Sequence, residues 1–259
     1  MDLPASSALS PRLVVLDSSP STNRALVAAA VAAPADWPHR SVLVTDDQTA
    51  GRGRLGRTWQ APAGTALAVS VLLRADGDAI PASWSWLPLL AGLAMVRAVD
   101  AVGPASPATI KWPNDILIDG RKVCGILAEI VPGAPVVVLG TGINLRMRAA
   151  DLPVPTATSL LLVGTAVADV DLPDRVLSGY LRELDALLPL LDTDPASLAA
   201  QVGDRCGTLG ARVRIDLPDG TQRFGVAQAL ASDGRLVVID ERDQEPLTVA
   251  AGDVTHLRY

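Results

Sequence analysis

The chain of 259 residues has little of several residue types that mark common function classes. It contains two cysteines and two histidines. Neither Cys124 nor Cys206 has a second cysteine or histidine at metal-ligand spacing, so a disulfide framework and a zinc site are both unsupported. His39 and His256 lack the companions of a serine-histidine-aspartate triad. We therefore expect buried free thiols and chemistry that needs no histidine.

Long hydrophobic runs are absent as well. Although 49% of the residues are apolar, no stretch approaches the roughly 18 consecutive apolar residues of a membrane span. Residues 1–10 lack the positive start and the long apolar core of a secretory signal. These absences predict a soluble protein of the cytoplasm with no membrane partner.

Lysine is scarce, since Lys111 and Lys122 are the only two among 22 basic residues. The net charge of −6 disfavours non-specific binding to nucleic acid, which depends on basic residues that neutralise phosphates. A cluster of positive charge is therefore informative in this chain. A lysine in such an arginine-rich background indicates a place where a compact ammonium serves better than a planar guanidinium.

Hydrophobic patterning in the first part of the chain predicts strands and helices in alternation. The expected strands are residues 13–16, 41–45 and 67–73, and the expected helices are 23–33 and 84–102. A polar, glycine-rich loop covers residues 46–64. A loop of this length is uncommon in a compact domain without a functional reason.

The rest of the chain predicts a meander followed by a small β module. Expected antiparallel strands are residues 109–112, 116–118, 122–131 and 136–139, expected helices are 172–191 and 195–202, and later short strands are 213–217, 222–229, 236–240 and 247–250. We expect an α+β catalytic domain, residues 1–205, with helices against a mixed or antiparallel sheet. A small β domain, residues 206–259, is expected to follow, with the boundary near residues 203–210.

The segment QTAGRGRLGRTW, residues 48–59, places three arginines among three glycines. Glycines let backbone amides approach an anion closely, and arginines offer forked donors to phosphate or carboxylate. The segment matches G-x-G-x-x-G, but no strand directly precedes it, and Pro62 and Gly64 would interrupt a helix after it, so a dinucleotide fingerprint is disfavoured. No Gly-Lys-Ser or Gly-Lys-Thr of a Walker A loop is present.

Two other interpretations of this loop stay open at this point. An isolated Arg-Gly-Arg triplet is equally typical of a solvated, mobile loop. Arginine and glycine mixed with an aromatic such as Trp59 also occur in single-strand nucleic-acid binders. The acidic background and the lack of a second basic or aromatic cluster disfavour the latter.

A lysine stands at the end of an expected strand in IKWPND, residues 110–115. A fixed cation beside an anion-binding loop stabilises charge on a phosphoryl oxygen or a leaving pyrophosphate. Lys111 is, on spacing alone, equally a surface lysine with a buried stem. Trp112 is expected in the core, and Asn114 and Asp115 are typical of a turn.

Glycines interrupt two neighbouring strands, at Gly125 in KVCGILAE and at Gly142 in GTGIN. A glycine weakens a strand unless something packs closely against it. The two glycine-bearing strands therefore predict a slot for a flat ligand, with Asn144 at its polar end.

In order and spacing, the motifs STN (21–23), QTAGRGRLGRTW, KWPND, KVCGILAE, GTGIN and ATSL (157–160) resemble the biotin-protein ligase family. The resemblance spans most of the chain. It implies a class II synthetase-like catalytic domain and an SH3-like β-barrel over residues 212–259. Lipoate-protein ligases share the catalytic fold but not this set of motifs.

The resemblance also implies roles for individual residues. Lys111 and Arg54 would be the catalytic groups, and magnesium would accompany ATP without a certain metal ligand in the sequence. Biotin would be surrounded by Ser21, Thr22, Asn23, Gln48, Arg52, Gly53, Arg54, Lys111, Gly125 and Gly142. The ATP side would be lined by Arg54, Arg57, Trp59, Lys111 and Asn144.

The implied activity is the ATP-dependent formation of biotinyl-5'-AMP, followed by transfer of biotin to one lysine of a biotin carboxyl carrier protein. Only about a dozen residues precede the first expected strand, so we expect a monofunctional ligase that binds no DNA. Two alternatives remain: a lipoate or octanoate ligase of the same fold, and a non-catalytic binder of nucleotides or single-stranded nucleic acid.

Overall fold

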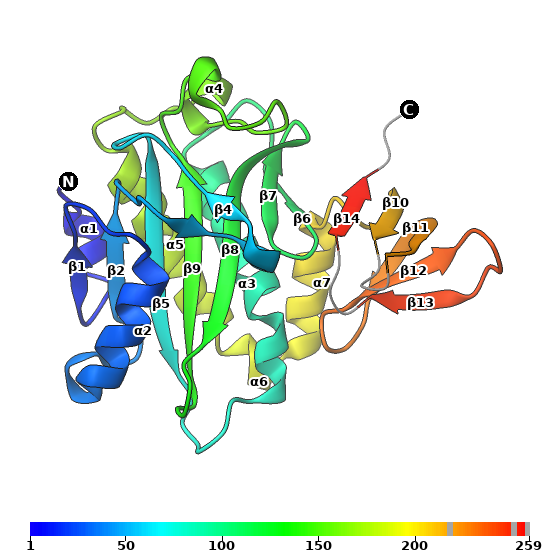
Figure 1. The fold of residues 1–259 in the computed structure, drawn as a ribbon, viewed down its shortest axis with the longest axis horizontal. Helices are drawn as coiled ribbons and strands as arrows, with labels where there is room; N and C mark the ends of the chain where they lie inside the picture. The colour runs from blue at the N-terminus through cyan, green and yellow to red at the C-terminus, as the bar shows by residue number, and fades with distance from the viewer. Residues whose placement is uncertain (217–219, 250–252, 257–259) are drawn as a thin grey trace.

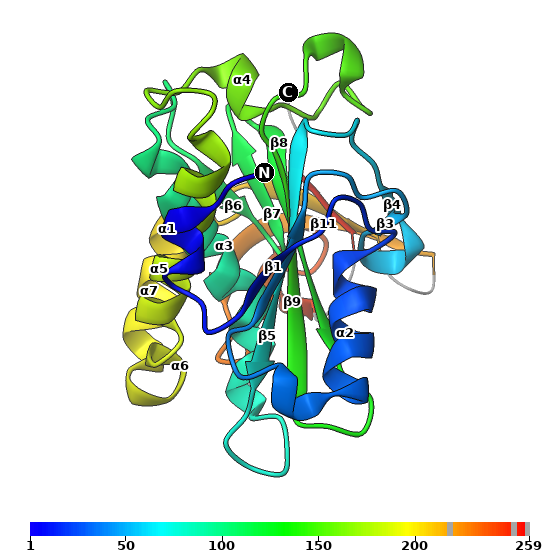
Figure 2. The ribbon, with the colours of Figure 1, turned by 90° about the vertical axis from the view of Figure 1, so that its left-hand side faces the viewer.

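The computed structural model describes residues 1–216, 220–249 and 253–256. A seven-stranded sheet forms the centre of the molecule, and a five-stranded sheet follows it at the C-terminal end (Figure 1). Helices cover both faces of the larger sheet (Figure 2). The expected α+β class is confirmed.

The strands of the seven-stranded sheet are β1 (Leu13–Val15), β2 (Val42–Thr45), β5 (Ala66–Arg74), β6 (Thr109–Lys111), β7 (Asp115–Ile118), β8 (Arg121–Ile130) and β9 (Val136–Asn144). A separate hairpin pairs β3 (Gly51–Arg52) with β4 (Thr58–Trp59). The five-stranded sheet contains β10 (Arg212–Asp216), β11 (Gln222–Leu230), β12 (Leu236–Asp240), β13 (Pro246–Val249) and β14 (Asp253–His256).

The α-helices are α1 (Pro4–Ser7), α2 (Thr22–Ala32), α3 (Leu87–Ala101), α4 (Leu160–Val163), α5 (Leu172–Leu187), α6 (Leu190–Thr193) and α7 (Pro195–Arg205). Short 3₁₀ helices are η1 (Pro34–Asp36), η2 (Arg54–Gly56), η3 (Ala82–Trp86) and η4 (Ala149–Asp151).

The larger sheet has the order β1-β2-β5-β9-β8-β7-β6. β1 and β2 are parallel, and every other neighbouring pair is antiparallel. The expected meander is confirmed, because β6, β7, β8 and β9 are consecutive in both sequence and sheet. β5 and β9 lie at the centre, which explains why almost every residue of β5 is buried.

A thick helical layer covers one face of the sheet, where α3 and α5 pack against each other and α3 packs on β8. η3 and α3 together, Ala82–Ala101, form the one helix in the described part of the chain that is long and apolar enough to span a membrane by length and composition. Inside the protein, 67% of its apolar window is buried. Its apolar character is thus that of a core helix.

The opposite face of the sheet is covered by α2 and by the β3–β4 hairpin (Figure 2). α2 is capped by Ser21, whose hydroxyl accepts a hydrogen bond from the Arg24 amide at 3.4 Å, as an N-cap should. Leu26 and Ala30 of α2 pack into a small apolar cluster on this face. The thinner cover leaves room for a cavity next to the start of α2.

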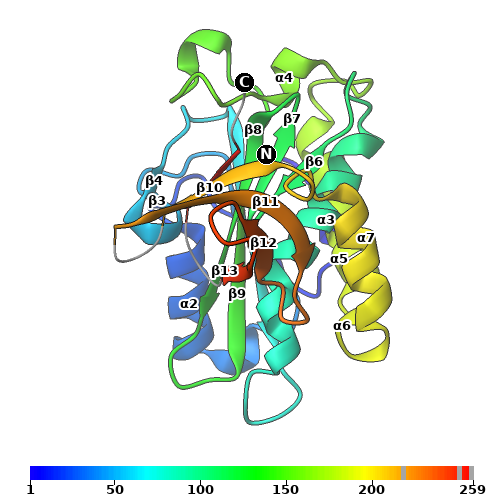
Figure 3. The same ribbon diagram turned by 90° about the vertical axis from the view of Figure 1, so that its right-hand side faces the viewer.

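The C-terminal sheet contains the four short strands that the turn signals predicted, although Leu217 and Ala250 of those predictions lie outside the described residues. β14 was not expected. The turn between β11 and β12 lies beside α3 (Figure 3). Two tryptophans fix it there, since Trp86 Nε1 donates to the Ser232 carbonyl at 2.8 Å and Trp112 Nε1 to the Gly234 carbonyl at 3.0 Å.

Three expected elements take a different form in the structure. The loop of residues 46–64 is partly ordered as the β3–β4 hairpin. The helix expected over residues 172–191 divides into α5 and α6 around Pro189, because proline has no N–H to continue the helical hydrogen bonds. β9 continues to Asn144 rather than ending at Leu139, since its glycines pair in register with β5 and β8.

Candidate active site

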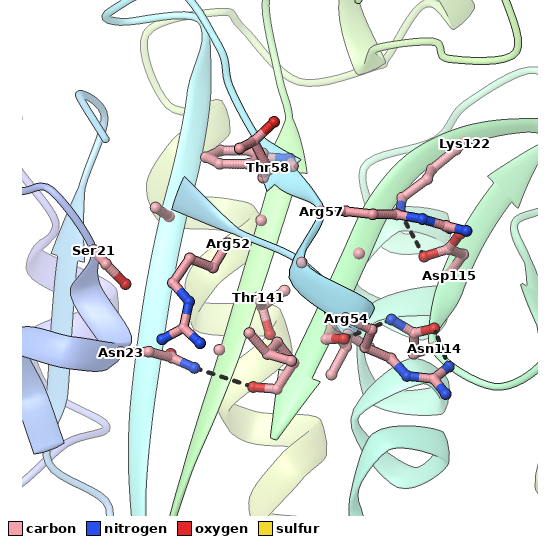
Figure 4. A pocket seen from close by; sticks show the side chains of 18 of the residues that line it. Ser21, Asn23, Arg52, Arg54, Arg57, Thr58, Asn114, Asp115, Lys122 and Thr141 are labelled. Atoms are coloured by element: carbon pink, nitrogen blue, oxygen red, sulfur yellow. Dashed lines mark hydrogen bonds and ion pairs between the residues drawn. The ribbon is translucent and has the colours of Figure 1, made fainter. Parts of the chain in front are cut away.

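A cavity of about 180 Å³ lies on the α2 face of the sheet, beneath the β3–β4 hairpin (Figure 4). It is lined by Ser21, Thr22, Asn23, Gln48, Arg52, Gly53, Arg54, Arg57, Thr58, Trp59, Ala68, Lys111, Trp112, Pro113, Asn114, Asp115, Lys122, Gly125, Ile126, Leu127, Gly140, Thr141 and Gly142. All of the proposed site residues except Asn144 are among them.

Small residues in register make the floor of the cavity. Gly125 on β8 pairs with Gly142 on β9, which pairs with Ala68 on β5. In the next row on the same face, Gly140 pairs with Ser70. Because side chains alternate between the faces of a sheet, these positions all point to the α2 side and leave a shallow slot there.

Close contacts explain two of the floor glycines. A Cβ on Gly140 would stand 2.3 Å from Asn23 Oδ1, and a Cβ on Gly142 would stand 2.8 Å from Cε2 of Trp59. Neither position can accept a side chain without moving its neighbour. Gly125 differs, because the nearest atom to its Cβ position is the mobile Nζ of Lys122 at 2.9 Å.

A polar network closes the end of the cavity nearest the N-terminus of α2. Gln48 Oε1 accepts hydrogen bonds from the Thr22 amide at 2.8 Å and the Thr22 hydroxyl at 3.1 Å. Ser70 Oγ lies 2.8 Å from Thr22 Oγ1 and 2.6 Å from Asn23 Oδ1. These side chains therefore hold one another in place without a ligand.

The side-chain nitrogen of Asn23, Nδ2, faces β8, where it donates to the Leu127 carbonyl at 3.2 Å and to Glu129 Oε2 at 2.8 Å. The other oxygen of Glu129 lies 3.3 Å from a guanidinium nitrogen of Arg52. Figure 4 shows the Arg52 guanidinium directed from the hairpin toward Asn23. One carboxylate thus contacts both α2 and the hairpin.

The hairpin is held closed by its own backbone, since the Gly53 amide donates to the Arg57 carbonyl at 2.7 Å. A Cβ on Gly51 would stand 2.5 Å from Gln48 Nε2 and from the Trp59 carbonyl oxygen, so this position requires glycine. At the tip, Leu55 is 68% exposed with φ of 56°. The left-handed backbone of a non-glycine residue is uncommon and marks a locally strained turn.

Cationic side chains occupy the other end of the cavity. Arg54 donates to Asn114 Oδ1 at 3.1 Å, and Asn114 Nδ2 donates to the Ile126 carbonyl at 2.7 Å. Burial lowers the pKa of Arg54, and the nearby Arg57 lowers it further, while Asp115 opposes both. A guanidinium that has already lost part of its hydration is ready to bind an anion.

Both lysines of the chain line this end. Lys111 is the last residue of β6, next to the cis Trp112–Pro113 peptide. Lys122 Nζ lies 2.6 Å from Asp115 Oδ1, in an ion pair that Figure 4 shows beside Arg57. The cavity therefore has a polar end at α2 and a cationic end at β6 to β8.

Sequence reasoning missed several lining residues. Asn114 and Asp115 were expected only as turn residues, and Lys122, Gly140 and Ala68 were not expected in the site. The scarcity of lysine was a usable signal for Lys122. The other residues come together only through the pairing register of the strands, and the spacing of residues within one segment does not predict that register.

Asn144 lies two residues beyond Gly142 on the same face of β9, and its side chain is buried. Its Nδ2 donates to the Thr158 carbonyl at 2.9 Å rather than into the cavity. The residue therefore links the end of β9 to the ATSL segment.

Cys124 faces away from the cavity, although it is next to Gly125 in sequence. It is 1% exposed in the core between the sheet and α3, and burial raises its pKa. Cys206 is buried as well, so the expected free thiols are confirmed. No cluster of three or more potential metal ligands occurs among the described residues.

Comparison with known proteins shows the family of the chain. Residues 15–144 match the model of the "Biotin/lipoate A/B protein ligase family". The biotin--[acetyl-CoA-carboxylase] ligase of Mycobacterium tuberculosis is 40% identical over 250 residues, which are 95% of this chain and 90% of that protein. The chain belongs to the biotin/lipoate protein ligase family. It is therefore a ligase, and the resemblance of its motifs is confirmed.

Other members of the family extend the comparison. The bifunctional ligase/repressor BirA of Escherichia coli is 30% identical over 200 residues, which are 75% of this chain and 60% of that protein. Among solved structures, the biotin protein ligase from Aquifex aeolicus in complex with biotin and ATP has a TM-score of 0.74 at 23% identity, with 95% of this chain and 100% of that chain covered. The biotin protein ligase from Leishmania major in complex with biotin has a TM-score of 0.59 at 25% identity, with 96% and 99% covered.

Proposed function

We propose that the protein is an ATP-dependent biotin-protein ligase that works in the cytoplasm, where ATP is available. The observation that carries the proposal is a cavity with a glycine floor, a polar end and a cationic end, in a chain 40% identical to a biotin--[acetyl-CoA-carboxylase] ligase. Biotin has a flat, polar ring system and an aliphatic tail that ends in a carboxylate. Its shape and polarity match those of the cavity.

In this proposal the ring system lies in the cavity beside Gly140 and Gly142, whose missing side chains leave room for those of Asn23 and Trp59. Ser21, Thr22 and Gln48 present hydroxyl and amide groups to the ureido ring. Such a site, a concave slot in which a few fixed polar groups converge, is typical of small-ligand recognition. The carboxylate of biotin then points to the cationic end.

The first step joins biotin to AMP. A carboxylate oxygen of biotin attacks the α-phosphorus of ATP, the bond to the β-phosphate bridging oxygen breaks, and pyrophosphate leaves. Arg54, Lys111 and Lys122 surround this place and lower the repulsion between the two anions. No general base is needed because the attacking carboxylate is already ionised at neutral pH.

Two hairpin residues, Arg57 and Trp59, are assigned to the adenylate. Both line the cavity, and the Trp59 ring packs over Gly142. Asn144 lies two residues beyond Gly142 on the same face of β9, and we assign it to the adenylate as well. An indole and a guanidinium are both suited to contact a nucleotide, through stacking and through charge.

Magnesium fits the residues present, provided that it arrives with ATP. Mg²⁺ is usually held by one or two carboxylates together with substrate phosphates, and Asp115 is a carboxylate that lines the cavity. The ion would supply further positive charge beside the phosphates.

The second step transfers biotin to a carrier protein. The amine of a carrier lysine attacks the carbonyl carbon of the mixed anhydride, AMP leaves, and the new amide nitrogen loses a proton. Before this happens, water has to be kept from the anhydride. The β3–β4 hairpin above the cavity is placed to exclude it.

The proposal is tested by ATP-pyrophosphate exchange with purified protein, magnesium, and either biotin, lipoate or octanoate. A biotin carboxyl carrier domain is then added and biotin on it is detected with streptavidin. We expect exchange that depends on biotin and labelling of the carrier. Exchange with lipoate or octanoate but not biotin would replace the substrate, and no exchange with any acid would overturn a ligase function.

A further inference from the structure

Glu129 lies outside the cavity but contacts two of the segments that enclose it. It is on β8, and its two carboxylate oxygens are divided between Asn23 of α2 at 2.8 Å and Arg52 of the β3–β4 hairpin at 3.3 Å. Its side chain is 25% exposed and that of Arg52 is 43% exposed. The helix start and the hairpin therefore meet at a single charged group.

We propose that Glu129 is a latch that holds the β3–β4 hairpin over the cavity before any ligand arrives. Arg52 is the second residue of the two-residue strand β3, so its position fixes the backbone of Gly51 and Gly53 on either side. Through Arg52, Glu129 sets how much of the unliganded protein has its hairpin in place. It is a positioning residue and touches neither substrate.

The strength of the contact suits such a role. An ion pair with this much exposure adds little to global stability, because solvent screens it. The same small contribution is enough to shift a local equilibrium between a placed and a displaced hairpin several-fold. A deeply buried pair would instead fix the hairpin and oppose the opening that ligand entry needs.

The remaining contacts of Asn23 make the latch directional. Asn23 is held by Ser70 Oγ at 2.6 Å and by the Leu127 carbonyl at 3.2 Å, and it packs directly on Gly140, whose lack of a side chain makes room for it. The α2 side of the latch is thus rigid. Opening therefore has to occur at Arg52.

Glu129→Gln separates the two contacts. Glutamine keeps a carbonyl oxygen that can accept from Asn23 Nδ2, but it removes the charge that attracts Arg52. The expected kinetic effect of the latch rests on the proposed biotin-ligase function. With biotin as substrate, we expect KM for biotin to rise roughly threefold to tenfold in Glu129→Gln while kcat of adenylate formation stays within about twofold.

A second readout does not depend on the activity at all. The hairpin carries Arg52, Arg54 and Arg57, each a site for trypsin, so the rate of limited cleavage there measures how often the hairpin is displaced. In the unliganded protein we expect Glu129→Gln to be cut several-fold faster than the wild type. If no exchange occurs with biotin in either protein, this measurement still tests the latch.

A matched control is available on the other face of the sheet. Glu183 of α5 pairs with Arg97 at 2.9 Å, with side-chain exposures of 31% and 35%. Glu183→Gln removes the same charge from a similar pair far from the hairpin. It should leave both KM for biotin and the rate of hairpin cleavage unchanged.

The double variant Arg52→Gln/Glu129→Gln tests whether Glu129 acts through Arg52. If it does, the double variant and Arg52→Gln alone should have the same KM for biotin and the same rate of hairpin cleavage. This is the result of a double-mutant cycle in which the two residues are fully coupled. Equal tryptic cleavage of Glu129→Gln and wild type would overturn the latch. So would a fall in kcat accompanied by loss of thermal stability, since that pattern belongs to a general structural role.

Discussion

The two faces of strands β8 and β9 carry different kinds of residue. Toward α3 and α5, the strands present Cys124, Ile126 and Ile143, all buried in the main apolar core. Toward α2, the same strands present Gly125 and Gly142, directly paired across the sheet. Alternate residues therefore serve different purposes, with large apolar groups on one face and, on the other, glycines that leave room for the cavity and for the Trp59 ring.

This division separates folding from ligand binding. Removing apolar volume from a packed core costs stability, whereas adding volume to a close-packed glycine displaces its neighbours. Changes on the α3 face should therefore act on the free energy of unfolding alone, whereas changes on the α2 face should act on the reaction and also lower stability where a neighbour is displaced.

The largest effect is expected at the cationic end of the α2 face. Lys111→Ala and Lys122→Ala should each slow adenylate formation by about 100-fold to 1000-fold, the usual loss when one group that stabilises developing charge is removed. Pyrophosphate exchange measures this. Because both side chains are partly exposed, the thermal midpoint should change little.

Arg121→Ala is the control for the two lysine variants. Arg121 is next to Lys122 in β8 but is not among the residues that line the cavity. Its exchange rate should match that of the wild type. Normal exchange in both lysine variants would refute the assigned roles.

A smaller effect is expected at the floor. Gly140→Ala forces Asn23 to move, because the new Cβ would stand 2.3 Å from Oδ1. We expect about 1–3 kcal/mol of destabilisation and a clear loss of biotin affinity by calorimetry. Gly125→Ala meets only the mobile end of Lys122 and should cost less. Equal losses in the two variants would show that the cavity floor is not organised as described.

On the opposite face, Ile143→Val should lower stability and leave the reaction unchanged. Ile143 is fully buried against the helical layer, and loss of one methylene group there costs about 0.5–1.5 kcal/mol. Urea unfolding measures this cost. The KM for biotin should stay within about twofold of the wild type, and a large change in KM would break the separation between the faces.

The smallest effect concerns Cys124. Burial raises its pKa, so the thiol stays protonated well above neutral pH and little thiolate forms. We expect a thiol reagent at pH 8 to leave the native enzyme active and unmodified at this position. Rapid loss of activity that tracks modification of Cys124 would contradict its placement in the core. After denaturation in urea, both cysteines should react.

Most strands and long helices could be predicted from the sequence, because their periodicity reflects the face that each buries. The hairpin could not, since β3 and β4 have two residues each and their pairing depends on the contacts around Gly51. β14 has four residues and was not expected either.

The site shows the same limit. The glycine-arginine segment and Lys111 were predicted from their chemistry within single motifs. Lys122 and Asp115 meet only because β7 and β8 pair with a register shift between Ile116 and Leu117. Glu129 contacts residues 77 and 106 positions earlier in the chain. Such contacts belong to the fold and not to any one segment.

The central claim is that the glycine face of β8 and β9 holds biotin with its carboxylate toward Arg54 and the two lysines. A crystal structure with a non-hydrolysable biotinyl-adenylate analogue tests it most directly. We predict the ring system beside Gly140 and Gly142, next to Asn23 and beneath the hairpin, and the phosphate linkage beside Arg54, Lys111 and Lys122. An analogue bound elsewhere, or in the reverse orientation with its rings at the cationic end, would contradict the account.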